Sequence, residues 1–152
     1  MALTDAERSK VALLLPGVQA KYLQYRRHAE AEGIRECVTQ TYRTVQQQHK
    51  KVAQKRSTNL IGWHPLRRGI DRFIWDPIAQ RWDNEAIKID LYLKANRIAE
   101  THGFRQIGFN DDGTKRILTG NIWDPFHIEW RHPWDTLVAA IEAEAPELLA
   151  TA

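Results

Sequence analysis

The sequence is poor in cysteine, long apolar runs and net charge, and each shortage narrows the class of protein. Its 152 residues include one cysteine, Cys37, so no internal disulfide can form and we expect a buried, unreactive thiol. No apolar run approaches the ~20 residues of a membrane span, so we expect no insertion into a membrane. The formal net charge of +3 is dispersed along the chain, which disfavours a nucleic-acid partner but favours approach to an anionic polymer.

The length and the N-terminal segment limit how the chain is organised. A chain of 152 residues suits one compact domain that buries its own core. The sequence shows no internal repeat, linker or low-complexity tract, so we expect residues 1–152 to form this single domain. Residues 1–7 lack the positive charge and apolar stretch of a secretion signal, so we expect synthesis in the cytoplasm without a signal peptide.

Capping residues and apolar spacing predict five helices. Thr4 and Glu7 form a capping-box pattern ahead of the first helix, and Pro16-Gly17 separates it from the second. The third is polar and rich in Gln and Lys, so we expect it to be exposed. The apolar face of the fourth comprises Ile87, Leu91, Ile98 and Ala99. The first four helices are predicted at residues 9–15, 18–33, 44–55 and 84–102, and the last ends near residue 146.

Runs of apolar and β-branched residues, bounded by turn signals, predict three strands. They cover residues 34–42, 69–75 and 128–130, and Asp76-Pro77 closes the second. Residues 57–59 are expected to form a loop and residues 110–113 a tight turn. Together with the helices, these strands predict an α+β fold with a small antiparallel sheet flanked by helices.

Two short segments far apart in the sequence carry residues suited to metal chemistry. In the first, His64 lies seven residues before Asp71, a spacing that taken alone also fits a loop histidine and a surface carboxylate. In the second, Asp124 and His127 flank a Pro-Phe turn, and the strand that follows would place His127 and Glu129 on one face. Two histidines and one carboxylate can bind zinc with its fourth position open, while a second carboxylate activates water. The pattern indicates a metallohydrolase with a zinc-site cleft.

The order of these residues resembles the M15 family of zinc peptidases, which act on D-alanyl-D-alanine or L-alanyl-D-glutamate bonds and include many phage endolysins. The matching positions are Tyr42-Arg43-Thr44, Gln48, His64, Asp71, a Trp-led helix from Trp82 to Gly103, Asp124, His127, Ile128 and Glu129. The resemblance implies that His64, Asp71 and His127 bind zinc and that Asp124 is the general base. It also implies that Arg43 and Gln48 bind substrate. Glu129 would either orient a ligand or lie at the surface.

The resemblance implies a monomeric zinc peptidase that cleaves an amide bond in the stem peptide of bacterial peptidoglycan. We first expect an L-alanyl-D-glutamate endopeptidase. It would act as a phage or prophage endolysin and reach the wall after release by a holin. The alternatives are a D-alanyl-D-alanine carboxypeptidase and a non-catalytic wall-binding module on the same fold. A basic nucleic-acid binder is a third class, but the sequence contains no nucleic-acid-binding motif.

Some positions depart from the family pattern or leave their role open. Members usually carry Ser or Thr two residues before the first ligand and Gly three residues after it, where this chain has Gly62 and Arg67. Trp63 and Trp123 each precede a motif residue, so they either wall the cleft or pack in the core. The remaining histidines are expected to be structural or solvated: His28, His49, His102 and His132.

Overall fold

The computed structural model describes residues 2–54 and 62–151, and the predicted loop at 57–59 lies outside these ranges. The helices are α1 (Asp5–Val11), α2 (Pro16–Ala31), α3 (Val45–Ala53), α4 (Ile89–Thr101) and α5 (Leu137–Glu144), followed by the 3-10 helix η1 (Pro146–Thr151). The strands are β1 (Glu36–Gln40), β2 (Gly69–Asp76), β3 (Arg81–Asp83), β4 (Arg105–Gln106) and β5 (His127–Glu129). The predicted α+β class is confirmed.

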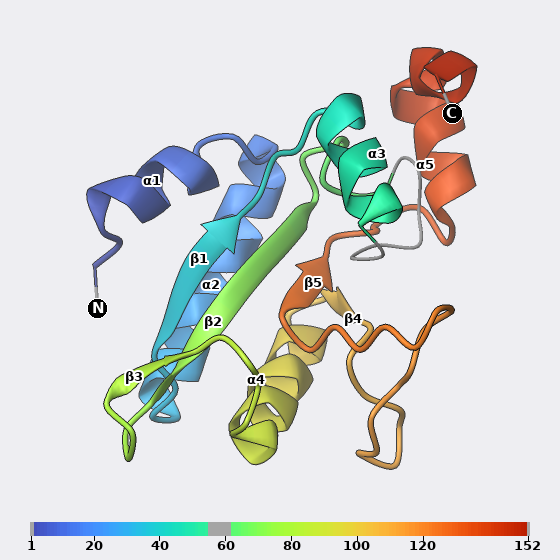
Figure 1. The fold of residues 1–152 in the computed structure, drawn as a ribbon. Helices are drawn as coiled ribbons and strands as arrows, with labels where there is room; N and C mark the ends of the chain where they lie inside the picture. Colours follow the sequence, from blue (N-terminus) through green and yellow to red (C-terminus); the bar gives the residue numbers. More distant parts are fainter. Residues whose placement is uncertain (1, 55–61, 152) are drawn as a thin grey trace.

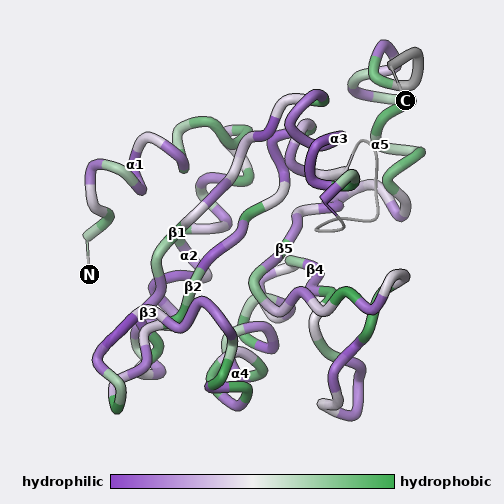
Figure 2. The backbone as a smooth tube through the Cα atoms, viewed as in Figure 1, coloured by the Kyte–Doolittle hydropathy of each residue, from purple (hydrophilic) through white to green (hydrophobic). Residues whose placement is uncertain are grey.

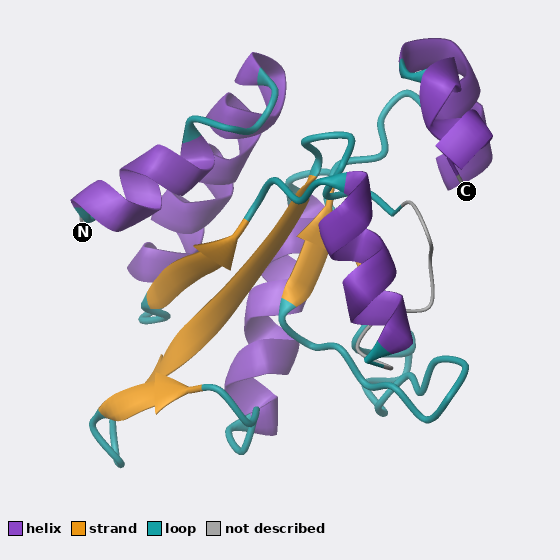
Figure 3. Cartoon of the chain, turned by 45° about the horizontal axis from the view of Figure 1, so that its top comes forward, coloured by secondary structure: helices purple, strands orange, loops and turns teal. Residues whose placement is uncertain are grey.

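The strands form one antiparallel sheet in the order β1-β2-β5-β4, and β3 pairs with β2. Helices α2 and α4 lie on one face of the sheet (Figure 1). Helix α3 lies on the other side, near the N-terminal end of β2 (Figures 1 and 3). Ile70 and Ile74 of β2 point toward α2 and α4 and are fully buried. Asp71, Phe73 and Trp75, which alternate with them, are half-buried on the opposite, more open face.

The helix boundaries show where local hydrogen bonds override apolar spacing. The capping box of Thr4 and Glu7 is present, but α1 ends at Val11 and not at residue 15. The fourth helix begins at Ile89 instead of residue 84, because the Asp83 carboxylate accepts the backbone N–H groups of Ile87 and Lys88 at 3.0 and 2.7 Å and holds this segment as a loop. Ile87 is therefore 56% exposed and does not belong to the buried face.

Helix α3 is polar, as Figure 2 shows, but the prediction that it is exposed is wrong at one position that bears on function. Thr44 caps it in a second capping box, completed by Gln47. Gln48 on its inner side is only 2% exposed. The side of α3 that faces the sheet therefore contributes to the interior of the site.

The structure also tests three smaller predictions, of which one is confirmed. The first predicted strand is shorter than expected, because a bulge between Val38 and Gln40 ends its regular pairing. Cys37 in this strand is half-buried and not buried, and burial raises the pKa of its thiol. The tight turn is confirmed, with the N–H of Gly113 donating to the carbonyl of Asn110 at 3.0 Å. In the described part of the chain, every helix is too short or too polar to span a bilayer.

Candidate metal centre and active site

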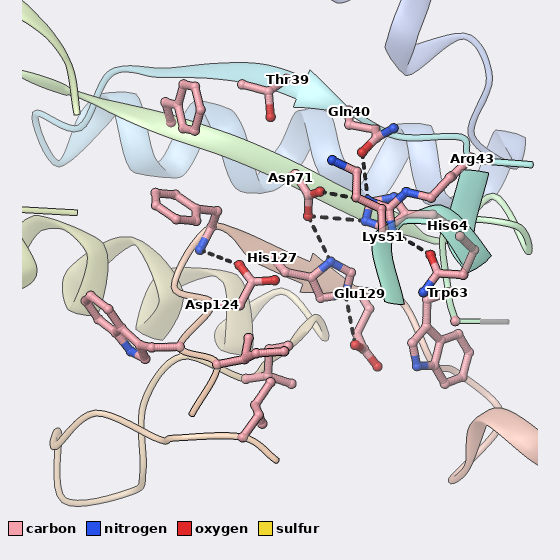
Figure 4. A pocket seen from close by; sticks show the side chains of 18 of the residues that line it. Thr39, Gln40, Arg43, Lys51, Trp63, His64, Asp71, Asp124, His127 and Glu129 are labelled. Carbon is pink, nitrogen blue, oxygen red and sulfur yellow. Dashed lines mark hydrogen bonds and ion pairs between the residues drawn. The ribbon is translucent and has the colours of Figure 1, made fainter. Parts of the chain in front are cut away.

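The structure brings His64, Asp71 and His127 together as one group. One donor atom from each residue lies within 4.8 Å of the others. Asp71 of β2 and His127 of β5 are direct partners across the sheet, whereas His64 reaches them from the turn that precedes β2. Figure 4 shows both imidazoles directed at the Asp71 carboxylate.

The hydrogen bonds on the far side of each imidazole orient the two histidines as metal ligands. His64 Nδ1 donates to the carbonyl of Thr41 at 2.5 Å, and His127 Nε2 donates to Glu129 Oε1 at 2.9 Å. These partners leave His64 Nε2 and His127 Nδ1 facing Asp71 Oδ1 at 3.2 and 3.0 Å. A carbonyl or carboxylate behind each ligating histidine is the usual arrangement in metal sites. The donor set fits a zinc ion, because three electron-pair donors converge on one point.

Gly69 makes the close approach of the two histidines possible. A Cβ atom at this position would lie 3.0 Å from His127 Cε1 and 3.1 Å from both His64 Cγ and the His64 backbone nitrogen. Any side chain would therefore press on both imidazoles at once. The absence of a side chain at Gly69 is thus a requirement of the site geometry.

The charges of the group reinforce one another. Burial opposes ionisation of Asp71, but the charge of His64 and hydrogen bonds from both histidines outweigh it and hold the pKa of Asp71 well below its usual range. Burial also opposes protonation of His127, yet its bonds to Asp71 and Glu129 raise the pKa of His127 to about 10. The site therefore attracts positive charge strongly, which is the electrostatic condition for holding a divalent cation.

Asp124 has the opposite electrostatic character. Burial and the nearby charge of Asp71 raise the pKa of its carboxyl group. One carboxylate oxygen accepts the N–H of Phe126 at 3.2 Å, and Figure 4 shows the side chain beside His127 at the edge of the group. Two carboxylates with pKa values pushed in opposite directions are characteristic of a site in which one binds and the other moves protons.

The turn that carries Asp124 is fixed from behind by residues that the sequence analysis missed. Arg72, fully buried, donates through Nη1 to the carbonyl of Phe126 at 2.7 Å. Asn96 of α4 donates to the carbonyl of Pro125 at 3.1 Å and accepts a bond from Arg72 Nη2 at 2.5 Å. These contacts join residues more than twenty positions apart, so no local pattern marks them.

Arg43 and Gln48 both lie at the site, where Arg43 contacts Asp71 and Gln48 contacts Arg43. Arg43 Nη2 lies 3.5 Å from Asp71 Oδ2 and 2.7 Å from Gln40 Oε1. Its Nη1 donates to Gln48 Oε1 at 2.5 Å. Gln48 therefore positions Arg43, and its role as a substrate ligand stays a prediction. Gln40, which completes the arrangement from the bulge in β1, was missed by the sequence analysis.

A cleft of about 760 Å³ contains the group. Trp63 and Trp123 both line it, which gives both tryptophans a place in the site. Trp63 is also buried against α5, and the Trp123 ring nitrogen donates to the carbonyl of Gly108 at 2.7 Å. Other lining residues that the sequence analysis missed include Thr39, Lys51, Phe73, Asn84, Ile107, Leu118, Asn121 and Ile122.

The two departures from the family pattern do not disturb the turn around His64. Arg67 stands where members have Gly, yet its φ is +61°, the left-handed conformation that a glycine would adopt. Its N–H donates to the carbonyl of His64 at 2.9 Å, and its guanidinium lies 4.4 Å from the centre of the Tyr42 ring. Gly62 has a φ of +79°, and a Cβ there would lie 3.2 Å from Gln48 Nε2.

Comparison with known proteins supports the fold. Neither a protein-family model nor a curated protein matches the sequence. Among solved structures, ChiX, the L-Ala D-Glu endopeptidase of Serratia marcescens, superposes with a TM-score of 0.63 at 14% identity, over 86% of this chain and 90% of that one. The LD-carboxypeptidase LdcB gives 0.57 at 13% identity, over 86% and 64% of the two chains.

A third structure, VanYB in complex with D-Alanine-D-Alanine, gives a TM-score of 0.51 at 18% identity, over 91% of this chain and 83% of that one. At these identities the likeness concerns the fold. The fold implied by the M15 resemblance is thereby confirmed. The roles of the individual site residues stay predictions.

Proposed function

We propose that this protein is a zinc-dependent peptidase that cleaves an amide bond in the stem peptide of bacterial peptidoglycan. The observation that carries the proposal is the convergence of His64, Asp71 and His127, each imidazole held from behind by its own acceptor. The adjacent carboxylate of Asp124, with its raised pKa, adds a proton acceptor. The fold shared with peptidoglycan peptidases gives this chemistry its substrate class.

The residues of the chain divide the work of hydrolysis. When bound by His64, Asp71 and His127, a zinc ion would polarise the scissile carbonyl and lower the pKa of the attacking water. Asp124 accepts the proton of that water and returns it to the leaving amine, a transfer that typically contributes ~100-fold or more. Arg43 holds Asp71 on one side and presents its guanidinium to the cleft, where it suits a substrate carboxylate.

The first choice of bond is L-alanyl-D-glutamate, and D-alanyl-D-alanine is the alternative. In both, the carbon attached to the scissile nitrogen also carries a free carboxylate, so one guanidinium serves either reaction. The likeness to ChiX, an L-Ala D-Glu endopeptidase, supports the first choice, whereas the cleft of about 760 Å³ has room for a stem peptide in either reaction.

The decisive experiment digests purified peptidoglycan with the zinc-loaded protein and identifies the new amino termini by mass spectrometry. Free D-glutamate amino termini establish the endopeptidase, and released D-alanine establishes the carboxypeptidase. Chelation should abolish cleavage, and added zinc should restore it. If the protein carries full zinc yet leaves walls of several chemotypes uncleaved, the non-catalytic wall-binding module would be favoured.

The proposal includes a role as a phage or prophage endolysin. Such a protein accumulates in the host cytoplasm and reaches the wall when a holin opens the membrane. Expression in a bacterial host should leave cells intact until a holin is co-expressed, and lysis should then require Asp124. Lysis at the same rate without the holin would contradict this localisation.

A further inference from the structure

The open face of the sheet continues beyond the cleft as an aromatic surface. Asp71, Phe73 and Trp75 alternate along β2 and share this face, and all three are half-buried. Phe73 lines the cleft. Trp82 of β3 lies directly opposite Trp75 across the strand pair, so it belongs to the same face.

Trp75 and Trp82 form a compact pair with a basic partner. Their rings meet at 5.2 Å between centroids with planes at 76°. Arg35 is an exposed residue that precedes β1, and its guanidinium carbon lies 4.9 Å from the centre of the Trp75 ring and 5.3 Å from the centre of the Trp82 ring. We call Arg35, Trp75 and Trp82 the aromatic platform.

The platform is continuous with the cleft. Asn84, two residues after Trp82, lines the cleft, and its N–H donates to the carbonyl of Trp82 at 3.1 Å. Trp75 lies four positions after Asp71 on β2, so at ~3.3 Å per residue the platform begins roughly 13 Å along the strand from the candidate metal centre. Helices α2 and α4 cover the opposite face of the sheet (Figures 1 and 3), and on this face Trp75 and Trp82 are half-buried and Arg35 is exposed.

We propose that the aromatic platform binds a sugar ring of the peptidoglycan glycan strand. Sugar rings present faces of C–H groups that pack on indoles, and an arginine beside them can donate to hydroxyl and acetamido oxygens. The stem peptide joins its sugar through the lactyl group and L-alanine. When the L-alanyl-D-glutamate bond lies at the candidate metal centre, the sugar is therefore close enough to reach the aromatic platform. The inference rests on the proposed function and adds a glycan subsite to it.

The test compares two substrates that differ only in sugar. One is a free stem peptide and the other is the same peptide attached to its disaccharide. For the wild type, kcat/KM should be about fivefold or more higher with the disaccharide, mainly through a lower KM. Arg35→Ala and Trp82→Ala should each reduce this preference toward one while leaving the free peptide unaffected. Ile78→Ala, at an 80% exposed position on the same hairpin, is the matched control and should keep the preference.

A binding experiment separates failure of this inference from failure of the proposed function. Peptide-free glycan strands are titrated into the chelator-treated protein, and indole fluorescence is followed. Saturable binding that Arg35→Ala weakens supports the platform even if no bond is cleaved. Thermal melting confirms that Arg35→Ala and Trp82→Ala are folded. Equal kcat/KM for both substrates in the wild type, or equal losses on both substrates in the variants, would overturn the glycan subsite.

Discussion

Asp71 and His127 are direct partners across β2 and β5, and the distance from His127 Nδ1 to Asp71 Oδ1 is 3.0 Å. Strand pairing therefore fixes two of the three candidate ligands without help from any loop. Backbone held in a sheet positions side chains more precisely than a loop does. His64, the third, is secured separately through the carbonyl of Thr41 at 2.5 Å.

Removal of any one candidate ligand should empty the site. We expect His64→Ala, Asp71→Ala and His127→Ala each to lower zinc content from about one ion per chain toward zero, because two remaining donors leave too few bonds for tight binding. Metal analysis of dialysed protein measures this. His132→Ala, at an exposed position away from the cleft, serves as the control and should keep its zinc. Full occupancy in the three ligand variants would disprove the assignment.

Gly69→Ala tests the site without removing a donor atom. The new methyl group would lie about 3 Å from both imidazoles, so the ligands must move apart. We expect zinc affinity to fall about tenfold or more, the range found when residues that orient ligands are altered. Competition with a chromophoric chelator gives the affinity. Gly17→Ala is a matched control, since nothing lies within 4 Å of its Cβ position.

The sequence predicted which residues meet at the candidate site better than it predicted where the helices begin and end. The grouping of His64, Asp71 and His127 was expected from the order of residues that resembles the M15 pattern, and the structure brings these three side chains together. The start of α4 depends instead on the Asp83 carboxylate binding two backbone N–H groups, a contact that apolar periodicity does not register. Gln48 was expected on an exposed helix for the same reason, because its burial depends on packing against Arg43.

The support behind the site could not be predicted from the sequence. Arg72 occupies a strand position that alternation assigns to the buried face, where an arginine is unexpected. Its charge is balanced by Glu36 at 3.3 Å, and Asn96 joins it to the turn before His127. Only the tertiary pairing of β1, β2 and α4 brings these residues together.

Arg43→Lys should impair catalysis while leaving the metal in place. Lysine keeps the positive charge near Asp71 but cannot reproduce the planar fork that contacts Gln40 and Gln48. We expect kcat/KM to fall about tenfold or more, since hydrogen bonds to charged groups are at stake. Zinc content and steady-state kinetics are measured together. Arg8→Lys, on an exposed ion pair in α1, should behave as the wild type.

Glu7→Gln should expose a pH-dependent part of the stability. Glu7 is buried, and although burial opposes its ionisation, the hydrogen bond and charge of Arg26 and the N–H of Val38 lower the pKa of its carboxyl group. A lowered folded-state pKa contributes stability above the unfolded value of about 4.3, and this stability is lost as the pH falls through the folded value.

At pH 7, Glu7→Gln should therefore cost about 3 kcal/mol of unfolding free energy, because the buried Arg26 loses its closer carboxylate and keeps only Glu30 at 3.4 Å. The difference from the wild type should shrink as the pH falls below about 4. Denaturant unfolding across this range measures both effects. Asp5→Asn, whose carboxylate is fully exposed, should leave the curve unchanged. A constant difference at every pH would refute the assigned role of the Glu7 charge.

Asp124→Asn separates metal binding from chemistry. The asparagine can still accept the N–H of Phe126, and the turn remains held through the carbonyls of Pro125 and Phe126, so fold and zinc content should not change. Without a group that can take a proton, peptidoglycan cleavage should fall ~100-fold or more. Asp112→Asn, in the exposed turn before Gly113, is the matched control and should retain full activity. Wild-type turnover in Asp124→Asn with zinc bound would assign proton transfer to another residue.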